Sequence, residues 1–493
     1  MQANLPRFSC YIDGEFADCA GVLESLDPAT GDPWAIIPMA DAQDTNRAVA
    51  AAARAFEDEA WRGLTATARG KLLFRIGDLL EREAPRLAEL ETRDTGKIIR
   101  ETRAQVAYMA DYFRYFGGLA DKVEGAHLPI DKPDMEVYLR REPIGVVAAI
   151  VPWNSQLFLT AVKLGPALAA GCTVVLKVSE DGCAPLLEFG RLVHEAGFPK
   201  GVVNIICGSG EECGRVLTSH PKVARVAFTG GPATARHIVR NTAENLAHTT
   251  LELGGKSPIV VFADADLESA ANAILAGIFA ASGQSCVAGS RLIAERAILD
   301  ALLARLKEKA EAIRIGPPGE MTTEMGPLAT ARQLRHIETV VAESLKSGAR
   351  LVTGGKRPPG FDKGFYYEPT ILAVPDNADP AAAQELFGPV LAAMPFEDEE
   401  DAVRKANGTA FGLAAGVFTR DLARAHRMIR RLRSGIVWVN TYRAISPMAP
   451  FGGYGHSGYA REGGQESIKD YLRTKSVWIS TSAAPIGDPF VMR

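Results

Sequence analysis

The sequence predicts an α/β protein built from more than one structural unit. From residue 144 to about residue 440, apolar runs of strand length alternate with runs of helical periodicity. The strand runs are continuously apolar, which is typical of parallel strands buried on both faces by the helices between them. The chain has 493 residues. At about 150 residues per domain, this length accommodates roughly three units.

The composition is that of an ordinary globular protein. Hydrophobic residues make up 47% of the chain and charged residues 23%, which excludes a disordered chain, a collagen-like repeat and a small disulfide scaffold. The 55 basic and 59 acidic residues give a net charge of −4. Without a dense block of Lys and Arg, binding to nucleic acid or to a membrane surface lacks an electrostatic basis. A small-molecule partner is therefore expected.

The chain carries no targeting or metal-binding pattern. Its first ten residues lack the charged-then-apolar order of a signal peptide, and its apolar stretches are much shorter than the roughly 18 residues of a membrane span. The seven cysteines form no C-x-x-C motif, so we predict reduced thiols and no metal site. We expect a cytoplasmic protein.

The first 120 residues are expected to be rich in helix. A turn-rich entry around residues 27–33 precedes two segments, 69–88 and 98–116, in which apolar residues recur at helical spacing. These segments predict two long amphipathic helices.

Strands and helices are then expected to alternate. The predicted strands cover residues 145–151, 173–177, 202–207 and 223–228. The predicted helices cover residues 157–170, 184–196, 211–219 and 233–246. After residues 251–255, a strand over 258–262 and an apolar helix over 267–281 open a second alternating region. Residues 123–141 and 476–480 fall outside both regions.

Two glycine-containing turns lie where a strand is expected to end and a helix to begin. The first, C-G-S-G-E-E-C, is similar to the dinucleotide fingerprint G-x-G-x-x-G, except that Cys213 replaces the third glycine. The second contains Gly230 and Gly231. Backbone N–H groups at such turns can bind a pyrophosphate, but each turn taken alone is equally consistent with a tight connection.

Cys286 follows the predicted apolar helix in the segment A-S-G-Q-S-C. A lone cysteine is more often a small buried apolar residue than a nucleophile. Three other segments favour the nucleophile: V-P-W-N ends at Asn154, L-E-L-G-G-K contains Glu252, and E-L-F-G-P starts at Glu385. Together they supply the residue types that one mechanism needs.

These segments resemble the aldehyde dehydrogenase superfamily. The motifs P-W-N, K-x-x-E, F-T-G, E-L-G-G-K, G-Q-x-C, E-x-F-G-P and P-F-G-G followed by S-G occur in the family's order between Pro152 and Gly458. The resemblance covers essentially the whole chain. It implies a Rossmann-type NAD-binding domain over residues 1–121 and 144–253 and an α/β catalytic domain over 254–456. It also implies oligomerisation segments and a tail over 122–143 and 457–493, and assembly as a homodimer or homotetramer.

The resemblance implies a reaction that explains these residue types. The Cys286 thiolate would attack the aldehyde, and the Asn154 amide with the Cys286 backbone N–H would stabilise the oxyanion. The resulting thiohemiacetal would pass a hydride to NAD and leave a thioester. Water activated by Glu252 would then release the carboxylic acid.

Cofactor residues are implied along much of the chain. Lys177, Ser179 and Glu180 would bind the adenine ribose, and the Glu180 carboxylate would disfavour the 2′-phosphate of NADP. Glu385 and Phe387 would hold the nicotinamide ribose and flank the ring. The predicted cofactor residues are Val151, Pro152, Trp153, Lys177, Ser179, Glu180, Gly210, Gly230, Gly231, Leu253, Gly254, Glu385 and Phe387.

Some positions depart from the family's usual residues. Val178 replaces a proline after the ribose lysine, and the pyrophosphate turn has Gly231 and Ala235 where a serine and a glycine are usual. Gly455 and His456 stand where a lysine commonly follows the tyrosine, and no function is assigned to them.

The predicted substrate pocket is wide and has a polar spot. Ser155 and Gln156 follow Asn154 where the family often has an aromatic residue and a proline, and Val162 stands where bulky aromatics are frequent. We therefore expect bulky, ring-bearing or polar-substituted aldehydes to be preferred over acetaldehyde, unless neighbouring loops refill the space. The predicted pocket residues are Ser155, Phe158, Leu159, Val162, Ala280, Ser285, Val287, Ile445 and Phe451.

Three other functions fit the sequence less well. A CoA-acylating dehydrogenase would not need a carboxylate to activate water, so Glu252 argues against it. A non-catalytic protein of the same fold would not need Cys286, Glu252 and Asn154 together. A cysteine amidase or esterase would need a histidine partner, and none of the eight histidines lies in a recognisable Cys-His motif.

Overall fold

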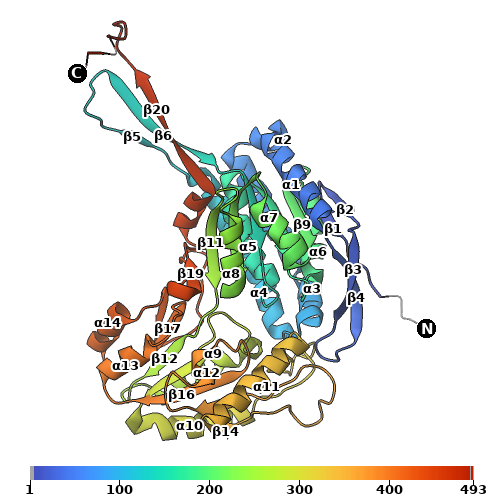
Figure 1. The fold of residues 1–493 in the computed structure, drawn as a ribbon, viewed down its shortest axis with the longest axis vertical. Helices are drawn as coiled ribbons and strands as arrows, with labels where there is room; N and C mark the ends of the chain where they lie inside the picture. Colours follow the sequence, from blue (N-terminus) through green and yellow to red (C-terminus); the bar gives the residue numbers. More distant parts are fainter. Residues whose placement is uncertain (1–4, 489, 492–493) are drawn as a thin grey trace.

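The computed structural model describes residues 5–488 and 490–491 and contains two large sheets and two small ones (Figure 1). Residues 1–4 lie outside the described residues. They belong to the N-terminal segment that lacks a signal-peptide pattern and to the predicted NAD-binding domain. Residues 489, 492 and 493 of the predicted tail also lie outside the described residues. No helix in the described part of the chain is long and apolar enough to cross a membrane.

The first large sheet contains the four strands predicted between residues 145 and 228. Its order is β19-β11-β10-β7-β8-β9-β1-β2, and β7 to β11 are parallel. Strands β7, β8 and β9 are buried along their whole length, as their continuous apolar runs predict. The bounds are β1 Cys10–Ile12, β2 Glu15–Ala17, β7 Val146–Ile150, β8 Thr173–Val178, β9 Val203–Cys207, β10 Val223–Gly230, β11 His248–Leu253 and β19 Gly458–Tyr459.

The helices of this unit confirm most of the predicted ones. Three boundaries differ. The helix predicted over 69–88 runs from Ala66 to Thr95. The segment predicted as a helix from residue 211 begins as a π-helical turn over Gly210–Gly214, and the last helix ends at Asn241. Asn245 lies in the turn that follows this helix, and its side chain donates to the carbonyls of Thr218 and His220. The bounds are α1 Ala42–Glu57, α2 Glu59–Arg62, α3 Ala66–Thr95, α4 Ile99–Leu119, α5 Gln156–Ala170, α6 Ala184–Ala196, α7 Arg215–Ser219 and α8 Pro232–Asn241.

The N-terminal region also contains strands that were not predicted. β1 and β2 pair at the edge of the first sheet, and β3 Gly21–Leu26 pairs with β4 Pro33–Met39 in a separate hairpin. β1 and β2 have only three residues each, which is too short for a periodic pattern to stand out.

The second large sheet forms the second predicted α/β region. Its order is β14-β15-β16-β13-β12-β17-β18, and every neighbouring pair is parallel except β14 with β15. Its strands are β12 Pro258–Val261, β13 Arg291–Glu295, β14 Arg350–Thr353, β15 Thr370–Ala373, β16 Val390–Phe396, β17 Ala414–Phe418 and β18 Ile436–Val439. Its helices are α9 Leu267–Ile278, α10 Arg296–Glu311, α11 Ala331–Lys346, α12 Pro380–Ala383, α13 Glu399–Ala406 and α14 Leu422–Arg431.

A three-stranded antiparallel sheet extends away from the rest of the molecule (Figure 1). It joins β5 Ala126–Leu128, β6 Met135–Pro143 and β20 Leu472–Ser480 in the order β20-β6-β5. The two segments expected to lie outside the α/β regions are thus paired with each other. Between them, β19 returns to the first sheet and pairs with β11, so residues 457–493 do not form one separate unit.

Candidate active site

The three predicted catalytic residues line one cavity, which has a volume of about 190 Å³. It lies beyond the carboxyl ends of β7, β10 and β11, where parallel α/β sheets commonly bind ligands. The second unit supplies the opposite wall. The cavity is lined by Pro152, Trp153, Asn154, Leu159, Thr229, Gly230, Gly231, Glu252, Leu253, Gly254, Cys286, Gln333, Glu385 and Phe387.

The loop that carries Cys286 starts with an unusual backbone. The helix predicted over 267–281 ends at residue 278, and Ala281 and Ser282 adopt left-handed conformations, each with φ +52°. Such conformations cost about 1–3 kcal/mol each unless their surroundings hold them. Here the Ala281 N–H donates to Glu101 Oε1 over 2.9 Å, and Ser282 Oγ donates to the Gly326 carbonyl over 2.9 Å. These bonds hold the turn that leads to the cysteine.

Two glycines allow this loop to pack closely against its neighbours. Gly283 has φ +72°, and a side chain there would overlap the Gly388 carbonyl. A Cβ atom on Gly255 would lie 2.6 Å from the Cys286 carbonyl oxygen. The G-G pair of L-E-L-G-G-K is therefore required partly by the position of the cysteine.

Asn154 is fixed beside the cysteine loop. Its side-chain Nδ2 donates to the Gln284 carbonyl over 3.1 Å, and Gln284 Oε1 accepts the Ala329 N–H over 2.9 Å. An amide nitrogen carries two hydrogens, so one N–H of Asn154 is left for another acceptor. The arrangement suits a preorganised donor to an oxyanion that forms at Cys286.

Glu252 lies on β11 and is 3% exposed. Neither carboxylate oxygen has a hydrogen-bond partner among the described residues. Burial raises the pKa of Glu252 well above its usual range, and the charge of Glu462 raises it further, while Lys163 and Arg461 act in the opposite direction. Lys163 and Glu462 form a buried ion pair behind it. A carboxyl group with a raised pKa is suited to accept a proton during a reaction.

The surroundings of Cys286 disfavour its thiolate. Burial, together with the nearby carboxylates of Glu385 and Glu252, raises the pKa of its thiol to about 12. Because the thiolate is the nucleophile, a proton must leave Cys286 before or during attack on a substrate. Glu252 lines the same cavity.

Glu385 is held against the glycine pair at the end of β11. Its Oε1 accepts the Gly255 N–H over 2.9 Å, and a side chain on Gly254 would overlap its carboxylate. Burial raises the pKa of Glu385 to about 7, opposed by the Gly255 N–H and the charge of Lys256. The carboxylate can therefore accept hydrogen bonds from hydroxyl groups in the cavity.

The sequence does not single out Gln333, which lines the cavity next to two aromatic residues. Phe387 and Trp153 lie edge to face with their ring centres 5.5 Å apart. Gln333 on α11 donates from Nε2 to the Phe387 carbonyl over 3.1 Å. A lone glutamine in an amphipathic helix gives no signal in the sequence. Thr229, whose hydroxyl has no partner within the described chain, could have been found from the F-T-G motif.

The residues predicted to bind the adenine ribose lie next to this cavity but do not line it. Lys177 is the penultimate residue of β8, and its Nζ donates to Glu180 Oε2 over 3.3 Å. Ser179 Oγ accepts the Asp181 N–H over 3.3 Å. The Val151 N–H donates to the Lys177 carbonyl over 3.2 Å, which joins this group to the strand that leads to Asn154.

The two glycine turns differ in how much space they leave. Gly231 precedes α8, and no side chain caps the N-terminus of that helix. A Cβ atom on Gly231 or on Gly210 would meet no atom within 4 Å. Cys213 is buried, and its side chain fills the space beside Gly208. Both turns thus leave open space beside backbone N–H groups.

Aromatic side chains occupy part of the region expected to be wide. Phe158 stacks on Tyr108 with ring centres 6.3 Å apart and lies edge to face with Tyr112 at 5.0 Å. The Tyr108 hydroxyl donates to the Ile445 carbonyl over 3.1 Å. Residues of α4, which the motifs did not indicate, therefore refill part of the space.

The other predicted pocket residues are in different settings. Leu159 lines the cavity, and Val287 and Phe451 pack in one apolar cluster with Cys286. Val162 is 6% exposed and belongs to the core of the first unit, so it acts mainly through packing. The loop before the cysteine carries two more, which do not line the cavity: Ala280 and Ser285.

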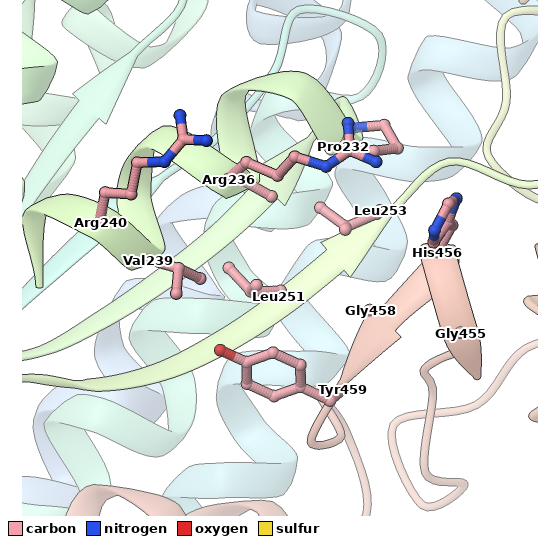
Figure 2. Close-up of a pocket in the computed structure, with 11 residues that line it drawn as sticks. Pro232, Arg236, Val239, Arg240, Leu251, Leu253, Gly455, His456, Gly458 and Tyr459 are labelled. Carbon is pink, nitrogen blue, oxygen red and sulfur yellow. The ribbon is translucent and has the colours of Figure 1, made fainter.

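A second hollow, of about 370 Å³, lies between α8, β11 and residues 455–459 (Figure 2). Figure 2 shows Arg236 and Arg240 on α8, with His456 beside the end of β11. Val239 and Leu251 make much of its surface apolar. Gly455 and His456 therefore line this hollow rather than the catalytic cavity.

Comparisons with known proteins agree with this geometry. The model of the aldehyde dehydrogenase family matches residues 16–477. The chain is 60% identical over 490 residues to (Z)-2-((N-methylformamido)methylene)-5-hydroxybutyrolactone dehydrogenase of Acinetobacter baylyi, covering 99% of this chain and 100% of the relative. It is 40% identical over 480 residues to betaine aldehyde dehydrogenase of Bacillus subtilis, covering 97% and 98%. A structure of betaine aldehyde dehydrogenase from Staphylococcus aureus in complex with NAD+ superposes with a TM-score of 0.95 at 37% identity, covering 98% of each chain.

Proposed function

The chain belongs to the aldehyde dehydrogenase family, and on this premise we propose how its own residues perform the reaction. The protein oxidises aldehydes to carboxylic acids and uses NAD as its cofactor. The observation that carries the assignment of roles is the meeting of Cys286, Asn154 and Glu252 in one cavity.

Cys286 is the nucleophile. Its sulfur adds to the aldehyde carbon, and its proton passes to Glu252, which forms a thiohemiacetal. The aldehyde oxygen becomes negatively charged and accepts hydrogen bonds from the free N–H of Asn154 and the backbone N–H of Cys286. The Asn154 amide costs little reorganisation because it is already held by the Gln284 carbonyl.

Glu252 then acts on water. NAD, when bound, accepts the hydride that leaves the thiohemiacetal, and the enzyme is left as a thioester on Cys286. Glu252 first releases the thiol proton to solvent. Its carboxylate then takes a proton from a water molecule, whose oxygen attacks the thioester carbon. The C–S bond breaks, the acid leaves, and the proton on Glu252 returns to the sulfur and restores the thiol.

The residues around the cavity fit the cofactor. Gly230 and Gly231 leave open backbone N–H groups at the start of α8, which suits a pyrophosphate. Glu385 is placed to accept from the hydroxyls of the nicotinamide ribose, and Lys177 with Glu180 to bind the adenine ribose. The buried hydroxyl of Thr229 has no partner in the described chain, as expected of a group that waits for a ligand. We assign the first sheet to NAD binding and the second to the cysteine.

The test is aldehyde-dependent formation of NADH by the wild-type protein and by Cys286→Ala. The variant should make no NADH yet still bind NAD, because alanine fills the site without a nucleophile. Cys183→Ala, which removes another buried thiol, is the matched control and should keep its activity. Turnover by Cys286→Ala would overturn the mechanism. Equal turnover with and without CoA would exclude acyl transfer to CoA.

We propose that the substrate is a polar-substituted aldehyde that also carries an acid or amide group. The Acinetobacter relative is named as the dehydrogenase of a substituted 5-hydroxybutyrolactone. A 5-hydroxybutyrolactone ring is the closed form of a four-carbon aldehyde acid. Ser155 supplies a hydroxyl next to Asn154, and aromatic rings of α4 and α5 form the apolar part of the region. This set suits a compact polar aldehyde better than acetaldehyde.

We also propose a homodimer or a dimer of dimers that works in the cytoplasm. β20 is an edge strand and carries exposed apolar side chains, including Trp478 at 57% and Ile479 at 44% exposure. An edge of this kind readily pairs with another chain, and the hollow of Figure 2 adds a second apolar surface. All seven cysteines, each within the described chain, are free thiols, which suits a reducing compartment.

A further inference from the structure

A buried lysine lies behind the residue that follows Asn154. Lys97 is 5% exposed, and its ammonium group makes three contacts. It donates to Glu91 Oε1 over 3.2 Å, to Gln105 Oε1 over 2.8 Å and to Ser155 Oγ over 2.9 Å. An ammonium group has three N–H donors. All the donors of Lys97 are thus used, and one of them is spent on a serine hydroxyl.

The Ser155 hydroxyl is not used in the ordinary way for its position. Ser155 precedes α5, where a serine side chain commonly accepts a hydrogen bond from the first turn of the helix. Its φ of −159° and ψ of 50° are accompanied by no such bond. Ser155 Oγ accepts from Lys97 over 2.9 Å and donates over 2.7 Å to a local acceptor, the Asn154 carbonyl. A hydroxyl that accepts from an ammonium group is a strengthened donor.

Ser155 lies beside residues that line the catalytic cavity. Asn154, its neighbour in the chain, and Leu159, one helical turn further on, both line that cavity. Ser155 itself is half-buried. The next side chain of the same helix face, Phe158, is packed among aromatic rings. The hydroxyl therefore lies between the polar group of Lys97 and the aromatic side chains around Phe158.

We propose that Ser155, polarised by Lys97, binds an oxygen atom at the far end of the substrate. This inference rests on the proposed function and narrows its substrate class to aldehydes with a carboxylate or carbonyl acceptor several bonds from the reacting carbon. Ser155 contacts the substrate and determines specificity. Lys97 is a positioning residue: it orients the hydroxyl. The Lys97–Glu91 pair is neutral overall. The substrate oxygen is therefore recognised by a hydrogen bond from the Ser155 hydroxyl rather than by a free charge.

The test compares two aldehydes with the same chain of four carbons, 4-oxobutanoate and butanal. The quantity measured is the ratio of their kcat/KM values in NADH formation. Removing one charge-assisted hydrogen bond should lower this ratio about tenfold or more in Ser155→Ala, mainly through KM for 4-oxobutanoate. Ser155→Thr keeps a hydroxyl and should restore most of the ratio. Lys97→Met should lower it in the same direction as Ser155→Ala.

Controls separate this inference from the proposed function and from misfolding. Lys97→Met leaves Glu91 buried without its cation, so the pair Lys97→Met with Glu91→Gln is made as well. Lys71→Met removes an exposed lysine of α3 and should keep the wild-type ratio. If the ratio of kcat/KM values in Ser155→Ala is within twofold of that of the wild type, the inference is wrong. The proposed function is still supported in that case if NADH forms. A normal ratio in the folded Lys97 variants, with a lowered one in Ser155→Ala, overturns the role of Lys97. Absence of NADH from every aldehyde with the wild-type protein overturns the proposed function itself.

Discussion

At the scale of single residues, the protonation state of Cys286 decides how the free protein reacts. Because its pKa is raised to about 12, the thiolate fraction grows with pH over the whole neutral range. We expect alkylation of Cys286 by iodoacetamide to accelerate about tenfold per pH unit between pH 7 and about pH 9, without a plateau. Mass spectrometry of the modified peptide measures this, with Cys286→Ala as the blank. A plateau near pH 8 would show that the thiol is already ionised.

Glu252 should affect the second half of the reaction more than the first. We expect Glu252→Gln to give one burst of NADH per active site, followed by slow turnover, because hydride transfer precedes the hydrolysis of the thioester. Stopped-flow absorbance separates the two phases. Since Glu252 is also placed to take the thiol proton, the burst itself should be faster at higher pH. Loss of the burst at every pH would place the whole role of Glu252 in the first step.

Glu180 should set the choice of cofactor. We expect kcat/KM with NAD to exceed that with NADP by at least about tenfold, equivalent to about 1.4 kcal/mol, because the half-exposed carboxylate at the end of β8 repels a 2′-phosphate. Glu180→Ser should reduce the preference. Asp181→Ser, a neutralisation one residue away, is the control. Equal use of both cofactors by the wild-type protein would contradict the assignment.

Short motifs made the catalytic residues predictable, whereas contacts between distant segments could not be predicted. Cys286, Asn154 and Glu252 each lie in a segment whose residue types suit one reaction, and the structure places them in one cavity. Lys97 contacts Ser155 across 58 positions of sequence. Gln333 reaches Phe387 across 54. No periodicity or motif encodes such meetings, because they depend on how separate elements of one unit pack.

At the scale of elements, the turn that follows α9 is the most demanding piece of backbone. We expect Glu101→Leu to lower stability by about 1–3 kcal/mol, since the partly buried Ala281 N–H loses its acceptor, and to lower kcat because the cysteine loop shifts. Thermal unfolding and NADH kinetics measure the two effects. Glu101→Gln keeps an acceptor oxygen and should retain most of both. Equal loss in both variants would show that the charge, rather than the hydrogen bond, matters.

Element boundaries show where the periodic pattern fails. The apolar pattern of α9 continues to residue 281, but the helix ends at Ile278 because contacts with Glu101 and Gly326 hold the next residues in a left-handed backbone. β1 and β2 were missed because strands of three residues have no visible period. By contrast, the parallel strands of both sheets were predictable, since burial on two faces leaves a continuous apolar run.

At the scale of the whole molecule, the projecting sheet should control assembly. We expect Trp478→Glu to weaken the oligomer, because a charge on the exposed apolar edge strand opposes pairing with another chain. Light scattering after size-exclusion chromatography measures the mass. Arg473→Glu, a charge change on the same strand but on an already polar side chain, is the control. A wild-type protein that remains a monomer at all concentrations would refute the proposed assembly.

The catalytic cavity lies between the two large sheets, so the reaction rate depends on how these sheets are positioned relative to each other. Asn154 and Glu252 come from the first sheet, Cys286 from the second, and single hydrogen bonds cross between them, such as Asn154 to Gln284 and Arg100 to the Thr323 carbonyl. A displacement of about 1 Å in reacting groups can cost a factor of about 10² in rate. A small displacement of one sheet relative to the other would therefore abolish turnover before the protein unfolds. Chemical damage, heating or a mutation far from the substrate should lower the turnover rate first, while the protein remains folded.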